Sequence, residues 1–197
     1  MANKTLSAAL RLLDEKILFP IRFDYLEDIL SPYLAGYGRV LDLGAGCGRL
    51  GKRLQDRTGA EFIGVDKFMQ QKPAIPIIRY DGRHLPFEDD SFDCVMMIDV
   101  LHHDKEHSKL ISEASRVSRK GILIKDHYWT NRLDFMVLSI GDCIGNLPYG
   151  VESAYNFLSL EQWYKLFADH DLRLKDQRKF RFAAADPTKQ VIFKLEK

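Results

Sequence analysis

Val40-Leu41-Asp42-Leu43-Gly44-Ala45-Gly46-Cys47-Gly48-Arg49-Leu50-Gly51 is the stretch that decides how this chain of 197 residues folds. The apolar character of residues 40–43 predicts a buried strand, and the glycines after it predict a sharp turn into a helix. Because glycine has no Cβ, the backbone of Gly44, Gly46 and Gly48 can approach a flat or charged ligand closely. The stretch therefore predicts a ligand-binding turn at the end of a central strand.

The glycine spacing alone leaves two ligand classes open. Gly46-x-Gly48-x-x-Gly51 satisfies the dinucleotide fingerprint, so a nicotinamide cofactor fits the pattern. Asp42, however, lies two residues before the first glycine, where a dinucleotide would bring its negative pyrophosphate. A carboxylate there disfavours a pyrophosphate and suits a ligand that carries a sulfonium and an amino group. Asp42 therefore favours S-adenosylmethionine.

Four motifs in order resemble those of the class I S-adenosylmethionine-dependent methyltransferases, of the type 11-like kind and a bacterial subgroup. Residues 42–48 resemble motif I of that family. Residues 62–66 resemble its second strand, whose terminal acid stands where a ribose-binding carboxylate is expected. Residues 81–93 resemble the adenine-side loop, and residues 98–103 resemble the end of strand four. Since the order of four motifs is more specific than any one of them, the resemblance identifies a cofactor-binding core.

The pattern along the chain predicts an α/β fold. Helices alternate with strands expected at 39–44, 61–66, 75–80, 92–98 and 120–125, followed by two more strands at 172–182 and 190–196. The resemblance implies a Rossmann-like, seven-stranded, mostly parallel sheet with helices on both faces and an antiparallel last strand. Helical spacing also predicts helices at 4–19, 104–118 and 133–144, and a capping box predicts one that begins after Ser159.

A single domain of four parts is expected from this pattern. The parts are an N-terminal helical cap (1–37), the cofactor-binding core (38–126), a lid or acceptor insertion (127–158) and a C-terminal helix with a strand pair (159–197). The insertion is rich in aromatic and apolar residues and is too long for an ordinary connection. It therefore favours a largely apolar small acceptor.

The cofactor contacts follow from strand-end positions and from the resemblance. Asp66 is expected to accept hydrogen bonds from both ribose hydroxyls, because a carboxylate offers two acceptor oxygens. The resemblance places Asp81 near the adenine and Asp99 near the amino group of the cofactor. The predicted cofactor-binding residues are Asp42, Gly44, Gly46, Gly48, Asp66, Lys67, Asp81, Gly82 and Asp99.

Three residues near the ends of strands four and five are candidates for acceptor orientation or for a general base: His103, His127 and Tyr128. Each of them can equally be a packed core residue. His103 and His107 have the i, i+4 spacing of helical metal ligands. Because no third ligand is clearly aligned with them, the sequence predicts no metal site.

The composition limits the cellular location and the binding partners that we expect. The net charge of +1 argues against a dedicated nucleic-acid binder, and Cys47, Cys94 and Cys143 are scattered singly. No run of 18 apolar residues and no signal-peptide pattern is present, so a cytoplasmic protein without a membrane span is expected. The expected partner is a small-molecule acceptor, and the oligomeric state is left open.

The function expected from the sequence is methyl transfer from S-adenosylmethionine to a small acceptor, with S-adenosylhomocysteine as product. Because the sulfonium is already reactive, the protein must mainly align the acceptor atom with the S–CH₃ bond and exclude water. Three alternatives remain: a cofactor-binding partner subunit without catalysis, an RNA or protein methyltransferase, and, less favoured, an NAD-dependent dehydrogenase.

Overall fold

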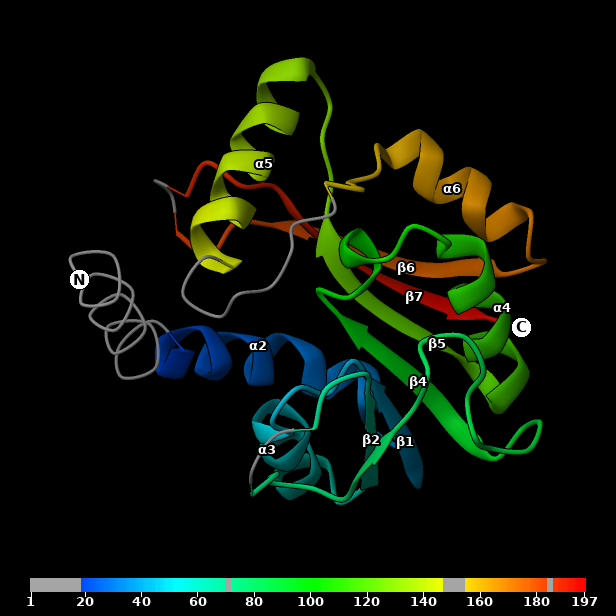
Figure 1. The fold of residues 1–197 in the computed structure, drawn as a ribbon. Coiled ribbons are helices and arrows are strands. Elements are labelled where there is room, and N and C mark those ends of the chain that lie inside the picture. The colour runs from blue at the N-terminus through cyan, green and yellow to red at the C-terminus, as the bar shows by residue number, and fades with distance from the viewer. Residues whose placement is uncertain (1–18, 70–71, 147–154, 184–185) are drawn as a thin grey trace.

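The computed structural model describes residues 19–69, 72–146, 155–183 and 186–197 (Figure 1). The strands are β1 (Arg39–Leu43), β2 (Glu61–Asp66), β3 (Ile77–Arg79), β4 (Phe92–Ile98), β5 (Ser118–His127), β6 (Arg173–Phe180) and β7 (Gln190–Glu196). The helices are α2 (Phe19–Leu34), α3 (Arg49–Thr58), the 3₁₀ turn η2 (Leu101–His103), α4 (His107–Val117), α5 (Arg132–Asn146) and α6 (Leu160–Ala168). The helix predicted at 4–19 lies outside the described residues, apart from Phe19.

All seven strands form one sheet in the order β3-β2-β1-β4-β5-β7-β6. The neighbouring pairs from β3 to β5 are parallel, whereas β7 is antiparallel to both β5 and β6. The predicted mostly parallel, Rossmann-like sheet with its antiparallel last strand is therefore confirmed. The strand order reverses between β1 and β4, and open α/β sheets bind ligands at such a reversal, beyond the carboxyl ends of the strands.

Two hydrophobic clusters cover the two faces of the sheet. Successive side chains of β1 alternate between them, since Val40 packs in the cluster that includes helices α2 and α3, and Leu41 and Leu43 pack in the one that includes α4 and α6. Figure 1 shows the same division of the helices. The apolar stripe predicted for α4 is buried as expected, and Trp163 of α6 is only 1% exposed. The helices thus fix the central strands from both sides.

Several boundaries differ from the prediction, and two of the differences affect the site. The helix predicted at 104–118 begins at His107, and residues 104–106 are a loop between it and η2, which ends at His103. His103 and His107 therefore do not share one helix. Strand β5 runs to His127, two residues beyond its predicted end, because Asp126 and His127 pair with β7. Strand β3 is short because it begins after Pro76, whose nitrogen has no hydrogen to donate.

The insertion predicted at 127–158 contains helix α5, which lies near the carboxyl end of β5 in Figure 1. The loop at 147–154 is outside the described residues. Helix α5 buries Leu138 but leaves Leu133, Met136 and Ile140 more than half exposed. The predicted capping box is present, because the Ser159 hydroxyl accepts from the Gln162 backbone and the Gln162 side chain accepts from the Ser159 backbone.

We expect Gly121→Ala to destabilise the sheet. A Cβ at this position of β5 would lie 2.0 Å from the carbonyl oxygen of Leu195 in β7. The strands must shift to relieve such a contact, which costs about 1–3 kcal/mol or more of unfolding free energy. Denaturant unfolding should show this loss. The matched control is Gly141→Ala in α5, where the described residues leave the Cβ position open and a gain of up to about 1 kcal/mol is expected. Equal stability of the two variants would contradict the argument.

Candidate functional site

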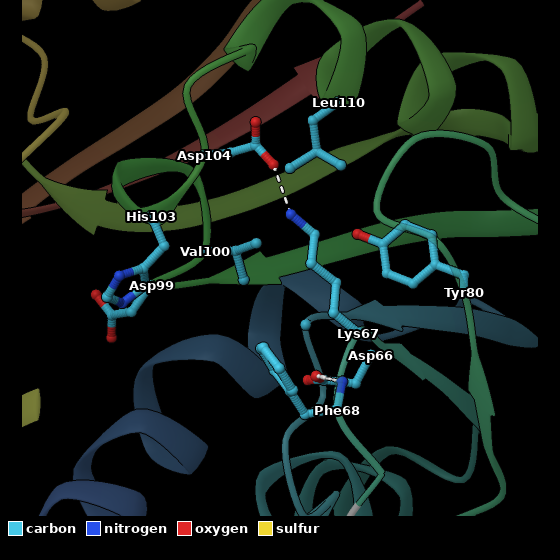
Figure 2. A pocket seen from close by; sticks show the side chains of 10 residues that line it. Asp66, Lys67, Phe68, Tyr80, Asp99, Val100, His103, Asp104 and Leu110 are labelled. Carbon is cyan, nitrogen blue, oxygen red and sulfur yellow. Dashed lines mark hydrogen bonds and ion pairs between the residues drawn. The ribbon is translucent and has the colours of Figure 1, made fainter. Parts of the chain in front are cut away.

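A cavity of about 270 Å³ opens at the carboxyl ends of β1, β2 and β4 (Figure 2). Gly44 follows β1, Asp66 ends β2 and Asp99 follows β4, so these positions meet because parallel strands end at the same edge. The lining residues are Gly44, Asp66, Lys67, Phe68, Tyr80, Asp99, Val100, His103, Asp104 and Leu110. The structure therefore brings together five predicted site residues at one cavity: Gly44, Asp66, Lys67, Asp99 and His103.

Asp66 holds the glycine turn beside this cavity. Its Oδ2 accepts a hydrogen bond from the Gly46 backbone N–H at 2.8 Å, and its Oδ1 accepts one from Phe68 N–H at 2.8 Å. Gly44 has a φ of +78°, and a Cβ there would lie 2.5 Å from the Val100 side chain. Only glycine fits this position without a shift, and the hydrogen bond to Gly46 ties the turn to the end of β2.

Asp42 and Gly48 lie outside the residues that line the cavity. Gly48 has a φ of +71° and caps the N-terminus of α3. The Asp42 carboxylate is buried below the turn, with Oδ2 2.9 Å from the position that a Cβ on Gly51 would occupy. Burial, and then the charge of Asp66, raises the pKa of Asp42 to about 7. The direct role of Asp42 toward a cofactor remains a prediction.

The predicted adenine-side residues also lie outside the lining. Asp81 is exposed and accepts hydrogen bonds from the Arg83 and His84 backbones, which lower its pKa. Gly82 has a φ of +83°, and a Cβ there would lie 2.2 Å from Cε of Lys67. Lys67 itself lines the cavity, and its Nζ lies 3.0 Å from Oδ2 of Asp104. Gly82 therefore makes room for a side chain that spans the cavity wall (Figure 2).

Five lining residues were not predicted: Phe68, Tyr80, Val100, Asp104 and Leu110. Phe68 could have been found, because an aromatic residue two positions after the strand-end acid is suited to stack on a planar ligand. It is 70% exposed, which is unusual for phenylalanine. Leu110 could not be distinguished, because it belongs to the ordinary apolar stripe of α4.

The Asp99 carboxylate belongs to a charged cluster at the ends of β4 and β5. Nζ of Lys125 donates to both Asp99 oxygens, at 2.6 and 2.8 Å, and the Arg22 guanidinium donates to Oδ2. Burial pushes the pKa of Asp99 upward, but these cations hold it well below its ordinary value. Burial lowers the pKa of Lys125 to about 8, against the opposing effect of Asp99. The carboxylate expected near the cofactor amino group thus already has two cationic partners.

Next to this cluster, Asp126 orients a buried histidine that the sequence did not single out. Oδ1 of Asp126 lies 2.6 Å from Nδ1 of His102. The backbone N–H groups of Leu101 and His127 donate to the same carboxylate at 3.1 and 2.7 Å. His102 was missed because only the pairing of η2 with the end of β5 reveals its partner.

The three predicted catalytic candidates occupy different places. His103 lines the cavity, and its pKa is lowered by burial and then by nearby His102. His127 is beside the Asp99 cluster, with Nδ1 3.5 Å from Asp99 Oδ1, and burial lowers its pKa. Tyr128 packs against the core cluster that includes Trp163 and carries the Lys179 ammonium over its ring. The structure therefore brings His103 to the cavity and leaves Tyr128 away from its lining.

Comparison with known proteins gives consistent matches. Residues 41–124 match the family model described as a methyltransferase domain. An uncharacterised protein of Methanocaldococcus jannaschii is 33% identical over 84 residues, which cover 43% of this chain and 41% of that protein. The uncharacterised methyltransferase YcgJ of Bacillus subtilis is 28% identical over 186 residues, covering 80% of this chain and 70% of the relative. The chain thus spans less than half of the first relative's length.

Solved structures match the fold over a longer span. The 1,6-didemethyltoxoflavin-N1-methyltransferase of Burkholderia thailandensis, with 1,6-didemethyltoxoflavin and S-adenosylhomocysteine bound, superposes with a TM-score of 0.68 and 14% identity. The match covers 97% of this chain and 87% of that one. Among the described residues, none of the helices has the length and apolar character that crossing a bilayer requires.

The raised pKa of Asp42 predicts a pH dependence of stability. The folded state keeps this proton up to a pH of about 7, whereas the unfolded chain releases it near its ordinary value of about 4. Between these values the folded state binds more protons, so Asp42 should reduce stability by about 1.4 kcal/mol for each unit that the pH rises. Asp42→Asn should remove this dependence. Urea unfolding from pH 5 to 8 measures it, with exposed Asp56→Asn as control; parallel curves for wild type and Asp42→Asn would contradict it.

Proposed function

We propose that this chain is a class I S-adenosylmethionine-dependent methyltransferase, as its match to a methyltransferase domain and its similarity to a methyltransferase of Bacillus subtilis suggest. In this proposal it transfers the cofactor's methyl group to a small, largely apolar acceptor by in-line displacement. The observation that carries the proposal is the single cavity that joins Gly44, Asp66 and His103. Gly44 has no side chain to keep a cofactor away from the backbone, Asp66 offers a carboxylate to a ribose, and His103 offers a titratable imidazole. All three lie at the edge of the sheet where the parallel strands end. In this proposal S-adenosylmethionine binds along β1 and β2, and the acceptor enters from the side of η2 and α5.

The cofactor half of the proposal rests on the Asp66 carboxylate. Each of its oxygens already accepts one backbone hydrogen bond, which fixes the direction of the remaining lone pairs. A ribose with two neighbouring hydroxyls can donate to these lone pairs. The exposed ring of Phe68 lies on the same wall of the cavity (Figure 2) and offers a flat apolar surface for an adenine.

The acceptor half rests on an aromatic wall between η2, α5 and the segment before α6. Its rings lie behind the cavity-lining His103, through contact with His102, and do not themselves line the cavity. Phe157 stacks on the His102 ring at 5.1 Å and contacts the edges of His127 and Phe135. Nε1 of Trp129 donates to the Phe157 carbonyl at 2.9 Å and fixes this segment. A wall of this kind favours an acceptor with a largely apolar body, and we propose that α5 acts as its lid.

The chemistry needs a base only when the acceptor must lose a proton, as a hydroxyl, ammonium or weakly acidic carbon must. His103 is suited to that role, because it lines the cavity and its lowered pKa keeps the imidazole neutral near pH 7. The alternative of a cofactor-binding subunit without catalysis uses the same glycine turn and Asp66, so only turnover with an identified acceptor separates the two.

Asp66→Ala should weaken S-adenosylmethionine binding by about 1–3 kcal/mol, the usual loss for hydrogen bonds to a charged group. Calorimetric titration with S-adenosylmethionine, S-adenosylhomocysteine and NADH measures the affinity and the cofactor class together. Glu161→Ala removes an exposed carboxylate from α6 and serves as the control. Unchanged affinity in folded Asp66→Ala would reject the assignment, and binding of NADH alone would reject the proposed function.

Substitutions on the acceptor side should separate turnover from binding. We expect His103→Ala and His127→Ala to lower turnover at least tenfold while cofactor affinity changes less than threefold, because both side chains lie beside the Asp99 end of the site. Tyr128→Phe should have the smaller effect, since Tyr128 packs in the core. Steady-state kinetics with an identified acceptor tests this. A larger loss of turnover in Tyr128→Phe than in the two histidine variants would contradict the proposal and place the acceptor on the side of β5 where Tyr128 lies.

A further inference from the structure

His102, His103 and Asp142 form a compact group between η2 and α5. One potential ligand atom from each residue lies within 4.8 Å of those from the other two. The side chains of His102 and Asp142 are only 5% and 10% exposed. We propose that this group binds a first-row divalent transition metal, with Zn²⁺ as the best match to two imidazoles and one carboxylate.

Asp126 prepares His102 for this role. Its carboxylate is buried and accepts hydrogen bonds from the backbone N–H groups of Leu101, His102 and His127. Such backbone donors favour the ionised form of the Asp126 carboxylate, which can only accept hydrogen bonds. Nδ1 of His102, 2.6 Å from Oδ1 of Asp126, therefore carries a hydrogen and donates this bond. Burial opposes protonation of this ring, but Asp126 and then Asp99 and Asp142 raise the pKa of His102, so a metal ion must displace a proton from Nε2. This carboxylate–imidazole arrangement is the one that orients metal-binding histidines in proteins.

The direction of Nε2 points to a cation. It faces Oδ1 of Asp142 at 3.8 Å, which is too long for a hydrogen bond. A proton on Nε2 or a metal ion can occupy the space between these two atoms, and an ion bound to both at about 2.0–2.2 Å would take the place of that proton. Two ligands of one tetrahedral ion lie about 3.3 Å apart by that geometry, so a small closure of α5 would complete the site.

His103 supplies a second imidazole on the same side. Its ring centre lies 4.1 Å from that of His102, and its buried Nδ1 has no hydrogen-bond partner among the residues that the structure describes. The sequence predicted no metal because it paired His103 with His107 on an expected helix and found no third ligand aligned with them. In the structure η2 turns His103 toward His102 instead, and His107 begins α4.

A second group of possible ligands nearby is a poorer candidate. Asp99, His102, Asp126 and His127 meet the same distance limit. However, Lys125 and Arg22 already donate to the Asp99 carboxylate, so a metal ion there would face two fixed cations. The group with Asp142 instead places two carboxylates, Asp126 and Asp142, around His102. A bound cation would therefore be better compensated in the group of His102, His103 and Asp142.

The position of the metal suggests a use, which rests on the proposed function. Because His103 also lines the cofactor cavity, open coordination positions of the ion would lie next to the acceptor. With the ion bound, His103 would act as a ligand, and the ion would replace it in the role of activating the acceptor. A Zn²⁺ ion with three protein ligands can bind an oxygen or sulfur atom of a substrate and lower its pKa. The acceptor class would then be a compound with a metal-binding hydroxyl or thiol on an apolar body.

Metal binding is tested directly on the full chain after removal of metals with a chelator. Calorimetry with Zn²⁺ and the visible absorption of added Co²⁺ should show one ion per chain. His103→Ala and Asp142→Asn should each weaken binding at least tenfold, and Asp126→Asn should weaken it about 10–100-fold through the orientation of His102. His84→Ala, which removes a histidine side chain that is 71% exposed, is the matched control and should leave binding unchanged.

Three results would overturn the metal site. They are the absence of Zn²⁺ binding, equal binding by all variants, and a His102 ring that nuclear magnetic resonance shows to be doubly protonated at pH 7.5 while Zn²⁺ is present. The last result would mean an imidazolium held between Asp126 and Asp142. The thermal midpoint of each variant separates loss of the fold from loss of ligands. A chain that binds S-adenosylmethionine but no Zn²⁺ would reject this site and leave the proposed function intact.

Discussion

The buried carboxylate of Asp126 is the contact on which the acceptor side of this molecule depends. It ties the end of β5 to the turn that follows β4, because it accepts from the backbone of Leu101 and from the ring of His102 at once. A buried carboxylate is costly unless every lone pair finds a donor, and here the donors come from two different elements. The direction of the η2 turn, and with it the place of His103 at the cavity, follows from that requirement.

A second buried charge, the Lys125 ammonium, lies beside the first, and Asp126 helps to raise the pKa of Lys125 against the effect of burial. Lys125 is fully buried, and its ammonium is directed to Asp99, with the Phe182 ring 5.2 Å away. Lys125 and Asp126 are neighbours in β5, and successive side chains of a strand point to opposite faces. The pair of Lys125 with Asp99 and the pair of Asp126 with His102 nevertheless meet at the strand ends, where His127 Nδ1 lies 3.5 Å from Asp99 and 3.6 Å from Asp126. Removing one partner from either pair would leave a buried charge unmatched, which is far more costly than never having the pair.

Sequence reasoning reached the cofactor half of the site because its signals are local. The glycines of 44–48 and the acid at the end of β2 stand next to the strands that position them, so spacing along the chain translates directly into space. The mostly parallel sheet and its antiparallel last strand came from the family resemblance, and the structure confirms them. Local signals also located the α4 stripe and the capping box of α6, whose partners are within a few residues.

The acceptor half had no such local signal, because its residues meet only through tertiary contacts. His102 is separated from Asp126 by 24 residues, and Asp142 lies on another helix. The sequence placed His103 in a helix, since the i, i+4 spacing with His107 is a valid helical pattern; the demand of Asp126 for backbone donors favours a 3₁₀ turn there instead. The buried carboxylate of Asp126 can thus override a local preference for helix. It changes the direction of the turn that carries His103, which spacing along the chain alone had paired with His107.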